Sequence, residues 1–154
     1  MAKLSKQEGK NFTAAHLGGW DELDNHTFKH EEGDFTYPRK LFLKKVLGLS
    51  GMEVSVNKLR PGEEVPFYHM HRVNEELYIF VKGKGQFMVD GEVIEVGEGT
   101  TIRVAPRGIR VWRNNSREDL YYIVVQAKAD TLPASDIADG KGFARKPEWP
   151  NEQT

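Results

Sequence analysis

Hydrophobic and polar residues alternate along the middle of the chain, which is the pattern of β-strands with one buried face. Between positions 52 and 56, Met, Val and Val alternate with Glu and Ser, and a Pro-Gly pair at 61–62 then ends the pattern. The same reasoning predicts further short strands at 41–43, 76–81, 86–89, 92–96, 101–104, 109–113 and 120–126.

Turn residues separate nearly all of these segments. The pair Asp90-Gly91 between two strand-like runs is a strong hairpin signal, and the stretches 83–85 and 106–108 mark other tight turns. The gaps are too short for the helices that an α/β fold needs between parallel strands. The pattern therefore predicts an all-β sandwich or barrel of about eight short strands.

The two ends of the chain lack the regular alternation of hydrophobic and polar residues. Residues 1–40 are polar and irregular, and we expect them to form an extension packed on the barrel, with Trp20 and Phe35 as anchors. The barrel itself is expected over residues 41–128. Residues 129–154 are rich in Pro, Gly and charge, and are interpreted as a tail with Trp149 as a candidate anchor.

Composition narrows the classes of partner. The 154 residues suit one domain, and 22 Lys and Arg against 23 Asp and Glu give no field for nucleic acid or an anionic membrane. Cysteine is absent, which excludes disulfides and thiolate chemistry. With no apolar stretch typical of a signal peptide near the start, the expected location is cytoplasmic. The expected partners are a small molecule and a second copy of the chain.

One short stretch carries candidate chemistry. His69 and His71 are two residues apart, so an extended chain projects both imidazoles from one face. Glu76 opens the next strand after a short turn and can return to the same point, while Glu75 would face solvent. Two imidazoles and one carboxylate form a typical site for a divalent transition metal. The plain alternative is a buried hydrogen-bonded cluster without metal.

These residues resemble the first motif of the cupin superfamily. That motif places Gly62, the His69-x-His71 pair, Glu76 and Gly83 in order, although the gap from Gly62 to His69 is one residue longer than usual. The resemblance covers roughly residues 41–128. It implies a double-stranded β-helix, or jelly-roll, barrel.

The second cupin motif is only partly present. Gly99, the stretch 106–108 and Asn115 match it, but Val111 stands where four-ligand cupins have a histidine. The gap from Gly99 to Pro106 is also one residue longer than usual. Three protein ligands leave open positions for substrate and oxygen, but loss of a ligand also suits a barrel without metal. Three other histidines are candidate replacements for the fourth ligand: His16, His26 and His30.

Strand parity predicts which side chains line the barrel interior near this site. The expected substrate pocket consists of Phe67, Tyr78, Phe80, Val111 and Arg113. Leu77, Ile79 and Val81 should lie on the outer face of their strand, together with Trp112 from a later strand. In the basic run that includes Arg103, Arg107 and Arg110, most side chains are expected in solvent.

The sequence thus predicts a single-domain cupin that binds a divalent metal ion (Fe, Mn, Ni or Zn) and a small organic ligand. The resemblance implies several activities, among which a metal-dependent oxygenase or isomerase is the enzymatic hypothesis. The alternatives are a binding or sensor cupin without turnover and a purely structural dimerising barrel. An apolar outer face on residues 76–81 favours a homodimer.

Overall fold

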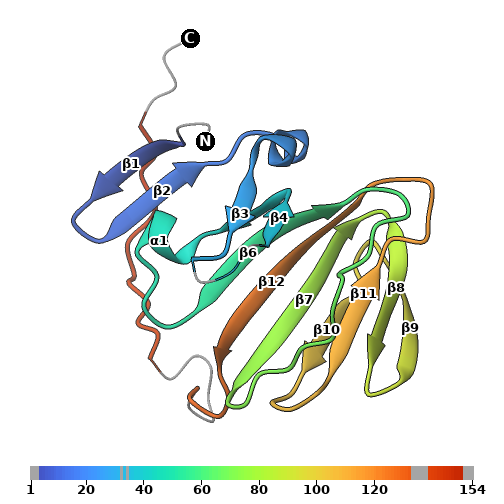
Figure 1. Cartoon of the computed structure of the whole chain (residues 1–154). Coiled ribbons are helices and arrows are strands. Elements are labelled where there is room, and N and C mark those ends of the chain that lie inside the picture. Colours follow the sequence, from blue (N-terminus) through green and yellow to red (C-terminus); the bar gives the residue numbers. More distant parts are fainter. Residues whose placement is uncertain (1–3, 32, 34, 133–138, 151–154) are drawn as a thin grey trace.

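A computed structural model describes residues 4–31, 33, 35–132 and 139–150 of the chain. These residues form antiparallel strands with very little helix (Figure 1). The short helical pieces are η1 (Trp20–Asn25) and α1 (Lys44–Leu47). The strands are β1 Ser5–Gly9, β2 Phe12–His16, β3 Thr27–Lys29, β4 Thr36–Pro38, β5 Lys40–Phe42, β6 Glu53–Leu59, β7 Asn74–Lys82, β8 Lys84–Val89, β9 Glu92–Gly97, β10 Thr101–Val104, β11 Arg110–Arg113 and β12 Leu120–Lys128.

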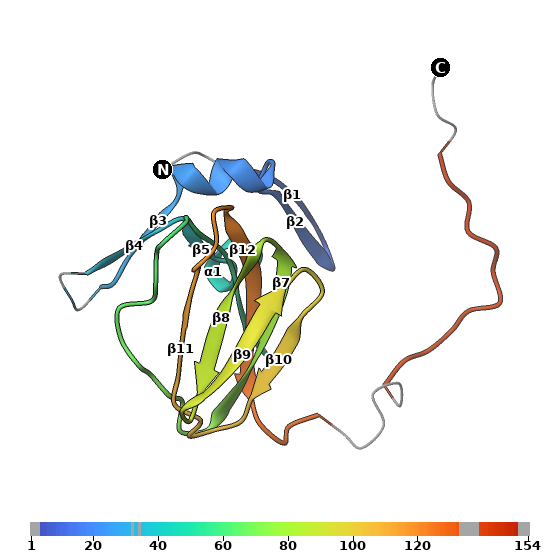
Figure 2. The ribbon, with the colours of Figure 1, turned by 90° about the vertical axis from the view of Figure 1, so that its right-hand side faces the viewer.

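Two sheets enclose the main core. One has the strand order β10-β7-β12-β6-β5 and the other has the order β11-β8-β9. The second sheet lies against the first in the side view (Figure 2). The all-β prediction is therefore confirmed, and the predicted barrel strands agree with β5–β12 to within a few residues at each end.

Aromatic side chains dominate the core between the sheets. Tyr78 and Phe80 on β7 are fully buried. Leu77, which projects to the opposite face of the strand, is 38% exposed, as the alternation of side chains along a strand predicts. Trp112 stacks on Phe87 with ring centroids 5.6 Å apart and planes 12° apart. The prediction that Trp112 lies on the outer face is wrong, because the register of β11 turns this side chain into the core.

A second, smaller core lies on the outer face of the larger sheet. There Leu23 of η1 packs with Val56 of β6 and Tyr121 of β12. The buried Lys58 ammonium adds ion pairs to Asp24 at 3.1 Å and to a carboxylate of the β11–β12 loop at 3.0 Å. This cluster explains why Val56 of β6 faces outward, whereas Ser55, Asn57 and Leu59 face the interior.

The side chains expected to anchor the two ends differ in their surroundings. Trp20 is 42% exposed and meets Tyr121 edge-on at 5.9 Å. Phe35 is 45% exposed and contacts Phe67 at 5.8 Å. Trp149 is 85% exposed, and the last described segment runs away from the barrel (Figure 2).

Candidate metal centre

The connection from β6 to β7 carries the two histidines in an extended segment beside β11. The backbone N–H of His69 donates to the Arg110 carbonyl at 3.2 Å, and that of Arg110 donates to the His69 carbonyl at 3.1 Å. The His71 carbonyl accepts a further bond from the N–H of Arg107 at 2.7 Å. The segment therefore behaves as an irregular extra strand, and both imidazoles line an interior cavity.

The two neighbouring carboxylates of β7 point to opposite sides, as strand geometry requires. Glu76 is 6% exposed and faces the histidines. Glu75 pairs with the exposed Arg103 on the outer side. The sequence-based choice of Glu76 over Glu75 therefore agrees with the structure.

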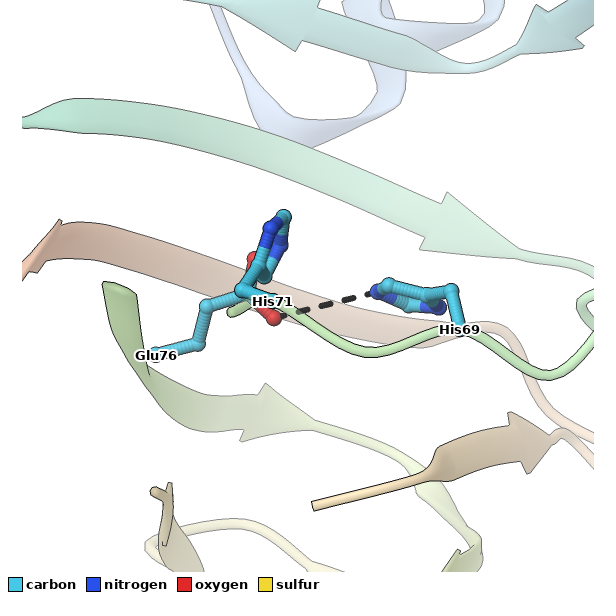
Figure 3. Close-up of side chains that lie close together, drawn as sticks. All are labelled: His69, His71 and Glu76. Carbon is cyan, nitrogen blue, oxygen red and sulfur yellow. Dashed lines mark hydrogen bonds and ion pairs between the residues drawn. The ribbon is translucent and has the colours of Figure 1, made fainter. Parts of the chain in front are cut away.

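His69, His71 and Glu76 converge on one point (Figure 3). One ligand atom from each residue can be chosen so that all lie within 4.8 Å of one another. The Nε2 atom of His71 lies 3.1 Å from Glu76 Oε1, and the Nε2 atom of His69 lies 3.9 Å from Glu76 Oε2. These separations suit donor atoms that share one ion, because metal–ligand distances of about 2.0–2.2 Å place neighbouring donors about 3 Å apart.

The local electrostatics favour an ionised Glu76 carboxylate and a neutral His71 imidazole. Burial by itself would raise the pKa of Glu76, but the nearby His69 imidazole and the hydrogen bonds from Tyr78 and Arg110 outweigh it and hold that pKa far below its usual range. Burial also lowers the pKa of His71. At neutral pH this centre therefore offers an ionised carboxylate oxygen and an imidazole lone pair, the protonation states that coordinate metals.

One oxygen of Glu76 is fixed by two buried donors. Its Oε2 atom accepts hydrogen bonds from the Tyr78 hydroxyl and from Nη2 of Arg110, whose side chain is 1% exposed. Burial raises the pKa of Tyr78, so its phenol stays protonated and acts as a donor. The Oε1 atom faces His71 and Gln126 instead, each at 3.1 Å. Hydrogen bonds such as those to Oε2 are typical of carboxylates that ligate metals.

The inward position of Arg110 follows from the strand register. Residues directly opposite one another in an antiparallel pair project to the same face, and His69 lies opposite Arg110. Arg110 and Trp112 therefore point inward and Val111 points outward. The motif spacing had placed Val111 inside, and a displacement of one residue reverses the side chains of a strand.

The prediction that Val111 and Arg113 face the interior pocket is accordingly wrong. Both line a separate outer groove together with Phe67. The guanidinium of Arg113 donates to the exposed Gln86 at 2.6–2.9 Å. Within the basic run, whose side chains were mostly expected in solvent, Arg110 is the buried residue.

The interior cavity beside the histidines has a volume of about 760 Å³. Phe67 and Tyr78 line it as predicted, whereas the inward-facing Phe80 lies deeper in the aromatic core and is not part of its wall. Aromatic side chains contributed by several elements cover much of the remaining wall: Phe28, Phe35, Tyr37, Phe42, Trp112 and Tyr122.

Gln126 of β12 is a site residue that the sequence analysis missed. Its Nε2 atom lies 2.7 Å from His71 Nε2 and 3.1 Å from Glu76 Oε1. A half-turn of the amide would bring the carbonyl oxygen to the same position, since the two orientations have nearly the same shape. Its inward parity with Tyr122 and Val124 was the available signal.

Lys40 is a second residue that went unnoticed, because it precedes the predicted strand 41–43. In the structure it is the first residue of β5 and lines the cavity. Its Nζ atom donates to Asn57 Oδ1 at 2.7 Å and to Ser55 Oγ at 3.3 Å. A lysine at the edge of an apolar run carries no sequence signal of an interior position.

The other candidate ligands lie elsewhere. Within the described residues, the group of potential ligands consists of His69, His71 and Glu76, without His16, His26 or His30. His26 is buried beside η1, where its N–H bonds to the Leu23 carbonyl. The donor set of the centre thus fits a divalent ion with three protein ligands, and Gln126 stands next to them.

Known proteins resemble this chain in sequence and fold. A family model described as a cupin domain matches residues 55–126. A cupin protein from Bacteroides fragilis is 38% identical over 68% of this chain and 88% of its own, with a TM-score of 0.65. None of the curated proteins matches the chain.

More distant structures share the fold. A putative sugar phosphate isomerase from Acidithiobacillus ferrooxidans is 23% identical over 59% of each chain, with a TM-score of 0.54. A protein from Photorhabdus luminescens is 19% identical over 58% of this chain and 74% of its own, with a TM-score of 0.53. Among the described residues, no helix has the length and apolar character needed to cross a bilayer.

Proposed function

Because this chain belongs to the cupin family, we propose that it binds a divalent transition metal ion through His69, His71 and Glu76. A small organic ligand occupies the adjoining cavity. The observation that carries the proposal is the convergence of three ligand atoms within 4.8 Å at the wall of a cavity of about 760 Å³. Cavities of this size hold molecules of metabolite size.

The proposed chemistry is that of a metal-dependent oxygenase or isomerase. A divalent iron, manganese, nickel or zinc ion in this centre would supply Lewis-acid polarisation of a ligand oxygen and, for the redox-active metals, oxygen chemistry. The chain's own residues have other tasks. Arg110 and Tyr78 hold Glu76 in one orientation, and the aromatic walls exclude water from the ligand.

Metal analysis of the purified protein tests the proposal. After reconstitution with Mn²⁺, Fe²⁺, Ni²⁺ or Zn²⁺ and desalting, the wild-type chain should retain about one equivalent of one metal. His71→Ala should retain less than about a tenth of an equivalent while its circular dichroism remains that of a folded β protein. His16→Ala, at an exposed position of β2, is the matched control and should retain the metal.

A wild-type protein that retains none of these metals would refute the metal proposal.

For protein that retains a metal, oxygen uptake with candidate catechols or diketones distinguishes an oxygenase from a protein that only binds its ligand. Turnover that requires the metal and disappears in His71→Ala supports the enzyme, whereas ligand binding without turnover supports a binding protein.

Two observations favour a second candidate function, a non-catalytic binding or sensor cupin without metal. The Arg110 guanidinium already balances the charge of Glu76, which reduces the attraction of the centre for a cation. The Nδ1 atom of His69 is buried and has no hydrogen-bond partner among the described residues, whereas a ligating histidine usually donates from its second nitrogen. The same metal analysis separates the two functions.

A further inference from the structure

The cavity contains a cation whose contacts are all with neutral groups. The Lys40 ammonium bonds to the side-chain oxygens of Asn57 and Ser55, and lies 4.7 Å from the centroid of the Phe42 ring. Within the described part of the chain, no carboxylate forms an ion pair with it. Buried ammonium groups usually have an acidic partner, because neutral acceptors only partly replace water.

A fully buried lysine of the same sheet shows the usual arrangement. Lys58 is 4% exposed, and its ammonium pairs with Asp24 at 3.1 Å and Asp119 at 3.0 Å. The fold therefore supplies two carboxylates to the lysine on the outer core and none at contact distance to the lysine in the cavity. This contrast suggests that the acidic partner of Lys40 comes from outside the chain.

The nearest acidic groups of the protein are already engaged. Glu76 and Glu53 act on Lys40 only through longer-range attraction. Glu76 is bound by Arg110 and Tyr78. Glu53 Oε1 accepts hydrogen bonds from two backbone N–H groups, at 2.9 and 3.1 Å, which hold it at the start of β6.

We propose that Lys40 binds the acidic group of the cavity's ligand, and that this ligand is a small organic anion with an apolar or aromatic body. The proposal rests on the proposed function in one respect, namely that the cavity holds a small organic ligand. It adds the ligand's charge and the residue that recognises it. The acidic group bonds to Nζ of Lys40, while the body lies among the aromatic side chains.

The aromatic wall explains the apolar body. The β3–β4 hairpin brings Phe35 and Tyr37 against Phe67, with ring centroids 5.8 and 5.9 Å apart. Phe35 and Phe67 remain 45% and 39% exposed, although they line the cavity. Exposed aromatic faces at a cavity wall provide stacking area for a ring or an alkyl chain.

Burial makes the charged form of the Lys40 ammonium less stable, and a bound anion would offset that cost. Burial lowers the pKa of Lys40 to about 8, so the group is mostly charged at pH 7 although it is incompletely solvated. An organic anion beside it would offset this desolvation. A neutral ligand of the same shape would not.

Two fluorescent probes of nearly the same shape test the proposal. Anilinonaphthalene sulfonate is an aromatic anion, and N-phenylnaphthylamine is its neutral counterpart. Both are titrated at pH 7 into metal-free wild-type protein, Lys40→Met, Lys40→Arg and the control Lys45→Met, whose lysine is exposed and pairs with Glu31.

We expect Lys40→Met to weaken binding of the anion about tenfold or more, the size of a charge-assisted hydrogen bond. Binding of the neutral probe should stay within about twofold, and Lys40→Arg should retain most of the anion binding. Lys45→Met should bind both probes as the wild type does. Circular dichroism of each variant establishes that it is folded.

Unchanged binding of the anion by Lys40→Met would overturn the proposal, and so would an equal loss of both probes. Wild-type protein that binds neither probe would overturn the cavity's role as a ligand site as well. Failure of the metal proposal appears in a different measurement, the metal content of the wild type, so the two failures can be distinguished.

Discussion

At the scale of single residues, each of the two neighbouring glutamates of β7 forms an ion pair with an arginine, one on the surface and one in the interior. Glu75 and Arg103 are 35% and 59% exposed, whereas Glu76 and Arg110 are 7% and 1% exposed. Solvent screens the first pair, so each partner loses little when the other is removed. In the second pair, removal of the guanidinium leaves a buried carboxylate without compensation.

We therefore predict unequal costs for two equivalent substitutions. Arg110→Met should lower the free energy of unfolding by about 3–5 kcal/mol, and Arg103→Met by less than about 1 kcal/mol. Urea unfolding at pH 7 measures both. Equal losses would mean that the interior pair is as well solvated as the surface pair.

Lys40 predicts a pH dependence of stability. Its pKa of about 8 in the folded chain lies below the ordinary value of 10.5, so the unfolded chain binds more protons between these values. The contribution of Lys40 to the free energy of unfolding therefore rises with pH between these two values, by about 1–3 kcal/mol in total. Below pH 8 the full cost of the buried charge is present.

The measurement is the difference in unfolding free energy between wild type and Lys40→Met from pH 7 to 10.5. The carboxylates that act on Lys40, Glu53 and Glu76, are present in both proteins, and Glu76 stays ionised because its pKa lies far below this range. The wild type should gain stability relative to the variant as pH rises. A flat difference would indicate that Lys40 keeps an ordinary pKa.

At the scale of strands and turns, two glycines allow the cost of backbone strain to be compared with the cost of a steric clash. Gly83, between β7 and β8, has φ +90°, and a Cβ there would lie 2.2 Å from the Asp119 carbonyl oxygen. Gly91, between β8 and β9, has φ +86° but open space around it. The two positions thus share a left-handed backbone and differ in their surroundings.

Alanine substitution should reveal this difference. Gly91→Ala should cost about 1–2 kcal/mol, the usual penalty of a left-handed residue with a side chain. Gly83→Ala should cost more, because the backbone around Asp119 must also move. Thermal or urea unfolding of both variants tests this, and equal costs would contradict the steric argument.

The same scale explains what the sequence could predict. Regular alternation and turn residues were sufficient for the barrel strands, and the His-x-His spacing with Glu76 was sufficient for the centre, because both depend on local geometry. The register of β11 was not accessible. It depends on which residue lies opposite His69 in a distant segment, and so Arg110, Val111 and Trp112 were assigned to the wrong faces.

Interior polar residues were missed for a related reason. Gln126 and Lys40 belong to the site because β12 and β5 flank β6 in the larger sheet. Strand order is a property of the assembled sheet and leaves no trace in either residue's neighbours. The four N-terminal strands, β1–β4, were also not located, since each pairs only within its own short hairpin.

At the scale of the whole molecule, the β1–β2 hairpin forms a sheet of its own, in which β2 contacts α1 and β1 is exposed (Figure 1). All five residues of β1 are exposed, and Phe12 at the start of β2 is 54% exposed. A two-stranded hairpin is at best marginally stable without a packing partner. We propose that a second copy of the chain covers this exposed face, since a homodimer is also the expectation from the sequence.

We predict that the protein is a homodimer in solution and that Phe12→Asp shifts it toward the monomer, because a buried carboxylate would oppose packing at the hairpin. Size-exclusion chromatography with light scattering measures the mass. Leu132→Asp is the matched control: Leu132 is 77% exposed and lies outside the hairpin, so its substitution should leave the dimer intact. A wild-type monomer at micromolar concentration would exclude the dimer, and a dimer that persists in Phe12→Asp would place the interface on another surface, such as Leu77 of β7.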